Sequence, residues 1–224
     1  EIPMSFTELQ VKSAFSSAAQ LNGFISMLVT SVENSLTVKI DAFIMRGINN
    51  MIGETLVSEL ATGAAGSKVV DYTKSGVRAV NLLKLYNDTN PTTKVSVASA
   101  MTNRDFVRFA TYQIGIVADR MTKISKLFNI GGKERFTAPD MRRAVLLSDF
   151  SKSVDTLSAA LLENPDRIAL PAHDVVPYWQ GSGKDYALSS TGIIDVKTAS
   201  GETVKLPAKG VGTGKKNAAI IGVL

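Results

Sequence analysis

Apolar residues at helical spacing over residues 14–36 predict one long amphipathic helix. The opposite side of this helix is polar and includes Glu33. A second helical stretch is predicted over about residues 39–60. Because an amphipathic helix must bury its apolar face against another element, we expect the first helix to pack on a sheet of its own domain. The apolar face consists of Leu21, Phe24, Ile25, Leu28, Val29, Val32 and Leu36.

The remaining sequence predicts short helices and strands. A strand is expected within residues 2–11, a helix over 75–86 and a brief strand at 95–98. The clearest helix begins at Thr102, which is a good N-cap, and runs to residue 128. Its apolar stripe comprises Phe106, Ala110, Val117, Met121, Ile124 and Phe128.

The C-terminal part is richer in strands. The compact apolar run 144–147 predicts a buried strand, and a helix is expected over 150–162. Residues 193–197 and 203–206, separated by a turn at 199–202, predict a hairpin, and residues 218–224 a last strand. Long helices followed by strands indicate an α+β class.

Composition excludes several classes of function. The 224 residues are 45% hydrophobic, carry a net charge of +5 and include no cysteine, so disulfide scaffolds, thiol catalysis and thiolate zinc sites are excluded. His173 is the single histidine, which excludes sites with paired histidine ligands. No apolar run approaches the roughly 18 to 20 residues that span a bilayer.

The two ends of the sequence suggest a piece of a longer protein. The chain begins Glu1-Ile2-Pro3 and stops within an apolar run that resembles a strand. Because a natural domain usually ends in polar, frayed residues, we expect a fragment or processed product.

Two glycine–lysine segments imitate phosphate-binding loops. They are residues 181–184 and 210–215. A P-loop needs a glycine five positions before its Gly-Lys pair and Ser or Thr after the lysine, and both segments lack both features. We therefore interpret them as surface turns and expect no nucleotide cofactor.

No catalytic constellation is visible. His173 and Asp174 are adjacent, so in a strand their side chains point apart, and no Gly-x-Ser-x-Gly motif occurs. The carboxylates are scattered, without a pair that would hold a metal or divide acid and base roles. Tyr178-Trp179 fits a packing anchor better than a base-stacking platform. We expect no catalytic, cofactor-binding or metal-binding residue.

The basic excess is localised in residues 104–143, which carry nine basic and four acidic side chains. One polar arc of the predicted helix collects four of the basic residues. A nucleic-acid face is one interpretation. A solvated face, or contact with an acidic neighbouring subunit, is the other, and we favour it because acidic residues interrupt the arc. The candidate subunit-interface residues are Arg104, Arg108, Lys123 and Lys126.

The order of elements resembles the major capsid proteins of tailed bacteriophages, the Hong Kong 97 fold, closest to those of small short-tailed phages. The resemblance rests on a short strand at residues 2–6, the long helix after it, the sequence Thr102-Asn103-Arg104-Asp105-Phe106, and residues 142–149. It implies a spine helix within a peripheral-domain part, residues 1–74. It also implies an axial helix-and-sheet domain at 75–190, and strands that return to the peripheral sheet at 191–224.

The same resemblance implies a structural protein rather than an enzyme. Such proteins self-assemble through pentamers and hexamers into the icosahedral shell of the virion, inside the bacterial host cytoplasm. Scaffold and portal proteins are further partners, and packaged double-stranded DNA is enclosed without sequence-specific contacts. Two alternatives remain open at this stage. One is a nanocompartment shell of the same fold, and the other is a nucleic-acid-binding protein that uses residues 104–143.

Overall fold

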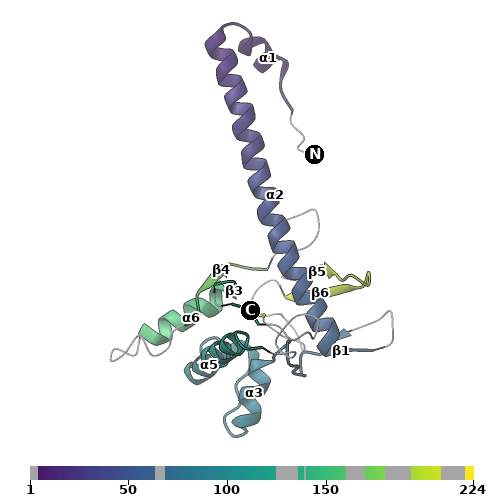
Figure 1. Cartoon of the computed structure of the whole chain (residues 1–224), viewed down its shortest axis with the longest axis vertical. Coiled ribbons are helices and arrows are strands. Elements are labelled where there is room, and N and C mark those ends of the chain that lie inside the picture. The colour runs from purple at the N-terminus through teal and green to yellow at the C-terminus, as the bar shows by residue number, and fades with distance from the viewer. Residues whose placement is uncertain are drawn as a thin grey trace. The chain divides into compact units, whose positions relative to one another are not determined.

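The computed structural model describes residues 5–63, 69–124, 136–138, 140–159, 170–179, 193–207 and 220–224. The chain divides into two compact units, Glu1–Gly47 and Ile48–Leu224, with the division inside one helix. Figure 1 shows the helices and strands of both units. The described part mixes helices and strands, so the α+β class is confirmed.

The first unit contains α1 (Glu8–Ala14) and the first part of α2 (Ala18–Leu60). Thr7 caps α1 in a reciprocal capping box, in which the Gln10 N–H donates to Thr7 Oγ1 (3.4 Å) and the Thr7 N–H donates to Gln10 Oε1 (3.0 Å). The expected strand at residues 2–11 is therefore wrong in its described part. The rings of Phe6 and Phe24 meet edge to face, with centroids 5.5 Å apart.

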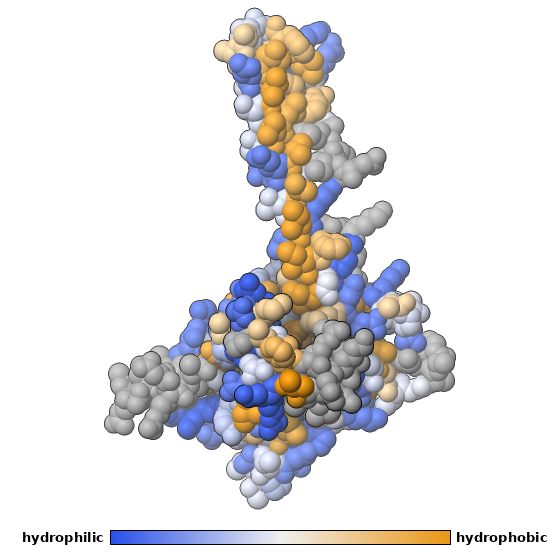
Figure 2. All heavy atoms as spheres, in the orientation of Figure 1, coloured by the Kyte–Doolittle hydropathy of each residue, from blue (hydrophilic) through white to orange (hydrophobic). Residues whose placement is uncertain are grey.

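α2 is one continuous helix, because residues 37–39 contain no breaker between the two predicted stretches. Its predicted apolar stripe is present, and Figure 2 shows it as an orange band along the helix. The prediction that a sheet buries this stripe is wrong for the described residues. Ile25, Val29, Val32 and Leu36 are 39–51% exposed, and Leu21, Phe24 and Leu28 are only partly buried.

The core of the second unit lies among three helices and one strand. These are α3 (Leu82–Thr89), α5 (Arg104–Arg120), α6 (Ser148–Ala159) and β3 (Ala144–Leu147). The predicted buried strand at 144–147 is thus confirmed. Tyr86 contributes edge-to-face contacts to Phe106 and Phe109, with centroids 5.7 and 5.5 Å apart. The largest fully buried side chains of this core are Phe150, Leu146 and Val107.

β3 is the central strand of a three-stranded sheet. It pairs in parallel with β4 (His173–Val176) and antiparallel with β7 (Gly222–Val223). The Leu147 N–H also donates to the Ile221 carbonyl (2.9 Å). Trp179 is fully buried, and its indole N–H donates to the Ile220 carbonyl (2.8 Å). This confirms Trp179 as a packing anchor and links the end of β4 to the C-terminal segment.

Two further strand pairs complete the second unit. β1 (Ala61–Thr62) pairs with β2 (Val69–Val70), and β5 (Ile193–Lys197) pairs with β6 (Thr203–Pro207), which confirms the predicted hairpin. Gly201 in its turn has φ +83°, a conformation that favours glycine. A Cβ added at Gly53 in α2 would lie 2.9 Å from Val196 Cγ1. The hairpin therefore contacts α2 at a position where only glycine fits without a shift.

The helices α3, α4 and α5 differ from the prediction. α3 begins at Leu82 rather than near 75, because Asn81 is its N-cap and accepts the Lys84 N–H (2.9 Å). Residues around 95–98 form a short helix, α4 (Val97–Ala100), capped by Ser96, and not a strand. The N-cap of α5 is Asn103, one residue after the expected Thr102, and α5 ends at Arg120 rather than near 128.

Candidate assembly surface

α5 separates a buried apolar face from a charged one. The side chains of Arg104 and Arg108 are exposed, lie one helical turn apart, and form no ion pair with another described residue. Tyr112, one turn further on, is 64% exposed. These three residues define the α5 outer face. The buried face consists of Phe106, Val107, Ala110, Thr111, Ile114 and Ala118.

The structure does not extend this face to the other two predicted residues. Lys123 is exposed but follows the end of α5, so it does not continue the helical arc, and Lys126 lies outside the described residues. Arg142 serves an internal contact, because Nη1 donates to the Ala118 carbonyl (2.6 Å) and lies 4.0 Å from Asp119 Oδ1. A cation at this place stabilises the carboxyl end of α5. Ile124, expected in the apolar stripe, is 72% exposed.

Glu59, near the end of α2, forms a polar clamp that no sequence pattern predicts, because its partners lie about 20 residues further along the chain. Its carboxylate accepts the Arg78 N–H (2.8 Å), the Ala79 N–H (2.9 Å) and the Arg78 Nε–H (2.9 Å). Burial by itself raises the pKa of Glu59, but these hydrogen bonds and the Arg78 charge outweigh it, so the pKa lies below the usual 4.5. A Cβ on Gly76 would lie 2.1 Å from Glu59 Oε2, so glycine is needed there.

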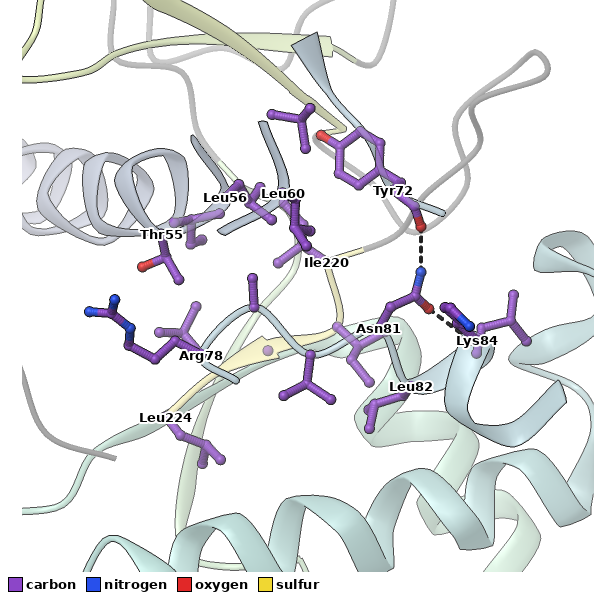
Figure 3. A pocket seen from close by; sticks show the side chains of 18 of the residues that line it. Thr55, Leu56, Leu60, Tyr72, Arg78, Asn81, Leu82, Lys84, Ile220 and Leu224 are labelled. Carbon is purple, nitrogen blue, oxygen red and sulfur yellow. Dashed lines mark hydrogen bonds between the residues drawn. The ribbon is translucent and has the colours of Figure 1, made fainter. Parts of the chain in front are cut away.

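A cavity of about 1400 Å³ lies within the second unit. Figure 3 shows its side chains from α2 (Leu56, Leu60), from the Tyr72–Lys84 stretch and from the C-terminal segment (Ile220, Leu224). The Asn81 amide donates to the Tyr72 carbonyl at its edge.

The acidic groups that line this cavity already have structural partners. Asp71 Oδ1 accepts the Thr73 N–H (3.0 Å) and the Thr73 hydroxyl (2.6 Å), and Glu54 accepts the Ala199 N–H. These carboxylates therefore hold loops in place. No group of three or more potential metal ligands occurs in the part of the chain that the structure describes.

A serine–histidine pair joins β4 to α6. His173 Nε2 lies 3.3 Å from Ser151 Oγ, and Nδ1 lies 2.8 Å from the Pro171 carbonyl oxygen. If Nδ1 carries the proton and donates to that carbonyl, Nε2 can accept the serine hydroxyl. Ser151 is buried and Asp174 is exposed, so this arrangement offers no accessible nucleophile and no carboxylate behind the imidazole. It acts as a structural tie.

The whole chain, rather than one pocket, decides its class. The model of the Phi29-like phage major capsid protein family matches residues 1–224. The chain belongs to this family. No curated protein and no solved structure gives a significant match.

Membership in the Phi29-like family makes the chain a structural protein of a phage shell, and its place is the virion. Proteins of this class are generally not enzymes, which agrees with the structural tasks of Ser151, His173, Asp71 and Glu54. No helix among the described residues has the length and apolar character needed to cross a membrane.

For this capsid protein, the two glycine–lysine segments remain predicted surface turns. Residues 181–184 and 210–215 lie outside the described residues. We expect titration calorimetry with ATP and Mg²⁺ to show no heat of binding, because neither segment has P-loop spacing. Micromolar affinity that is lost on Lys184→Ala or Lys215→Ala would contradict this expectation.

Proposed function

We propose that this chain is the shell-forming part of a phage head and self-assembles, through pentamers and hexamers, into a closed icosahedral shell around double-stranded DNA. The observation that carries the proposal is the match to the Phi29-like major capsid family along residues 1–224. Assembly takes place in the host cytoplasm, where scaffold and portal proteins are further partners. The DNA is packed by bulk neutralisation and needs no sequence-specific contact.

We assign the predicted domains to the same shell. Residues 1–74 form the peripheral-domain part with the spine helix, residues 75–190 the axial domain, and residues 191–224 the strands that return to the peripheral sheet. The continuous α2 (Ala18–Leu60) supports the spine-helix assignment, since a long helix is what the resemblance requires near the N-terminus.

Within this proposal, the α5 outer face contacts a neighbouring subunit. Arg104 and Arg108 stand outside the core of their own unit and have no ion-pair partner among the described residues. A contact between subunits needs local charge complementarity, because like charges brought together at an interface cost several kcal/mol. Lys123 and Lys126 remain candidates for the same contact, although they are not on the described part of the helix.

Electron microscopy of the assembled product tests the shell itself. We expect closed, icosahedral particles when the protein is produced together with whatever scaffold its phage supplies. Particles that enclose an enzyme cargo and no DNA would instead favour the nanocompartment alternative. The family match gives no support to that alternative or to a nucleic-acid-binding function.

Charge reversal tests the α5 outer face. Arg104→Glu with Arg108→Glu should block or misdirect assembly and leave the fold intact, because both side chains are exposed. Sedimentation follows assembly and circular dichroism follows the fold. The matched control is Lys94→Glu with Lys152→Glu, which makes the same change in net charge at exposed sites outside α5.

Two results would count against this assignment. Normal shells from the α5 variant that fail only to retain DNA would show that the face meets the genome. Equal loss of assembly in the α5 variant and the control would show that net charge, rather than this particular face, governs assembly.

A further inference from the structure

We infer that the exposed stripe of α2 in the first unit binds the same stripe of a second copy, antiparallel, with Leu36 on the two-fold axis. This inference rests on the proposed shell function, because a shell supplies the second copy. Beyond the shell function, it identifies which surface of the subunit forms one contact and how the two copies are oriented there. We call the surface the α2 stripe, and it consists of Ile25, Val29, Val32, Leu36, Ile40, Phe43 and Gly47.

The α2 stripe is straight and its apolar side chains are exposed, as are Met27, Val38 and Ile44 on other sides of the helix. A helix turns by 100° per residue, so residues that lie 4, 7 or 11 positions from Leu36 all fall within about 40° of it. Its six side chains are between 39 and 74% exposed, with Phe43 the most exposed. The Phe6–Phe24 ring contact lies to one side of the stripe, about 120° from Leu36 around the helix. The contact made by Phe6 therefore leaves the stripe open.

The spacing of the stripe is the same in both directions from Leu36. Val32 and Ile40 lie four residues away, Val29 and Phe43 seven, and Ile25 and Gly47 eleven. Two copies placed antiparallel about Leu36 would therefore bring each stripe position opposite another. This self-matching is what an isologous two-fold contact requires.

Side-chain size favours the antiparallel pair over a parallel one. In an antiparallel pair the large Phe43 lies opposite Val29, and Ile25 lies opposite Gly47. A Cβ added at Gly47 meets nothing within 4 Å, so space is present there. In a parallel pair, Phe43 would lie opposite Phe43, and the two rings would hold the helices apart. Gly47 would lie opposite Gly47, which would leave a void between the helices. Facing helices pack best when large residues lie opposite small ones.

The exposed area is sufficient for a specific contact between two copies. With roughly 50 to 100 Å² of exposed apolar area for each of the six side chains, one stripe forms a patch larger than scattered surface residues produce. Two such stripes together bury on the order of 1,000 Å², which reaches the lower range of specific interfaces. An interface of this size is sufficient for a specific contact between copies, and other contacts in the shell add to its stability.

Cysteine cross-linking tests the contact directly, because the chain has no natural cysteine. Under a mild oxidant, Leu36→Cys should form covalent dimers, since that position lies opposite itself. Val29→Cys and Phe43→Cys should cross-link with each other when mixed, and each alone should cross-link far less. Val38→Cys is the matched control. That residue is 61% exposed and lies on the opposite side of α2, so it should not cross-link.

A charge exchange gives a second measurement. Leu36→Glu and Leu36→Lys should each raise the dissociation constant of the dimer at least about tenfold, because like charges would meet on the axis. An equimolar mixture of the two variants should recover association, as measured by sedimentation equilibrium. Circular dichroism should show that both variants keep their helices, because position 36 is exposed.

The outcomes separate this inference from the shell function. Efficient cross-linking of Val29→Cys with itself would establish a parallel pair and overturn the antiparallel one. Normal shells from Leu36→Glu, with no cross-linking at Leu36→Cys, would show that something other than a second stripe covers α2, and the shell function would stand. Cross-linked Leu36→Cys dimers from a protein that never forms shells would support the pair and count against the shell function.

Discussion

Replacing Phe150 by alanine should lower the free energy of unfolding of the second unit by about 3 to 5 kcal/mol. Phe150 is fully buried in the cluster that joins α3, α5, α6 and β3. Its removal costs the transfer free energy of the ring and leaves a cavity, because helices and strand pack around it from several sides. Urea denaturation followed by circular dichroism measures the loss.

The matched control for this change is Phe136→Ala. Phe136 is 60% exposed, so its replacement should change the free energy of unfolding by no more than about 0.5 kcal/mol. Similar losses for the two phenylalanines would contradict the packing described for α6. If a sheet buried the spine helix, Leu28→Ala would lower the free energy of unfolding strongly. Because Leu28 is only partly buried, this change should have a small effect on the unfolding of an isolated chain.

Replacing Glu59 by alanine should cost about 2 to 3 kcal/mol at pH 7, because the N–H groups of Arg78 and Ala79 and the Arg78 guanidinium all lose their acceptor. The Glu59 side chain is 13% exposed, so water replaces the carboxylate poorly. Denaturation of the variant and the wild type gives the difference. Glu8→Ala is the control, since its pair with Lys12 is on the surface.

The same variant has a predictable dependence on pH. The pKa of Glu59 is lower in the folded protein than its usual 4.5. The contribution of the ionised carboxylate to stability is therefore fully present above pH 4.5, and it disappears as the pH falls through the folded pKa. The difference between wild type and Glu59→Ala should therefore shrink as the pH falls below 4.5 through the folded pKa. A difference that stays constant over the whole acidic range in which the protein is folded would show that the clamp does not depend on the charge.

Local sequence signals predicted the elements whose stability is local. The apolar run at 144–147 became β3, and the two runs around the turn at Gly201 became the β5–β6 hairpin. Asp105 lies in the first turn of α5, where a carboxylate interacts favourably with the helix dipole. Such elements carry their own pattern and turn residues, so one sequence is sufficient to find them.

Two elements were predicted wrongly because a tertiary contact or a cap outweighs the propensity of their residues. The predicted helix start near 75 ignored the Glu59 clamp, which holds residues 76–79 in a non-helical loop. Val95 and Val97 favour a strand where the short α4 lies, but Ser96 caps this segment as a helix by accepting the Ser99 N–H with its hydroxyl oxygen. Propensity is a weak signal wherever capping or tertiary contacts compete with it.

For the candidate surfaces, the sequence likewise predicted local features but not the contacts between distant residues. Periodicity identified the apolar face of α2 correctly, but it carries no information about what covers that face, and the expectation of a sheet was wrong for the described residues. On α5, the spacing of Arg104 and Arg108 was sufficient to place both on one face. The serine–histidine tie was missed because Ser151 and His173 are 22 residues apart, and only the packing of β4 beside α6 joins them.

The order of strands in the β4–β3–β7 sheet has a consequence for synthesis. Both neighbours of β3 follow it in the chain, and Val223 of β7 is 76 residues beyond Leu147. At about 5 to 20 residues per second, a ribosome needs roughly 4 to 15 s to make that stretch. During this time the edge of β3 that will receive β7 has no strand to pair with. Each newly made subunit therefore completes its central sheet late, after almost all of this sequence has been translated, and an unpaired strand edge is open to other chains until then.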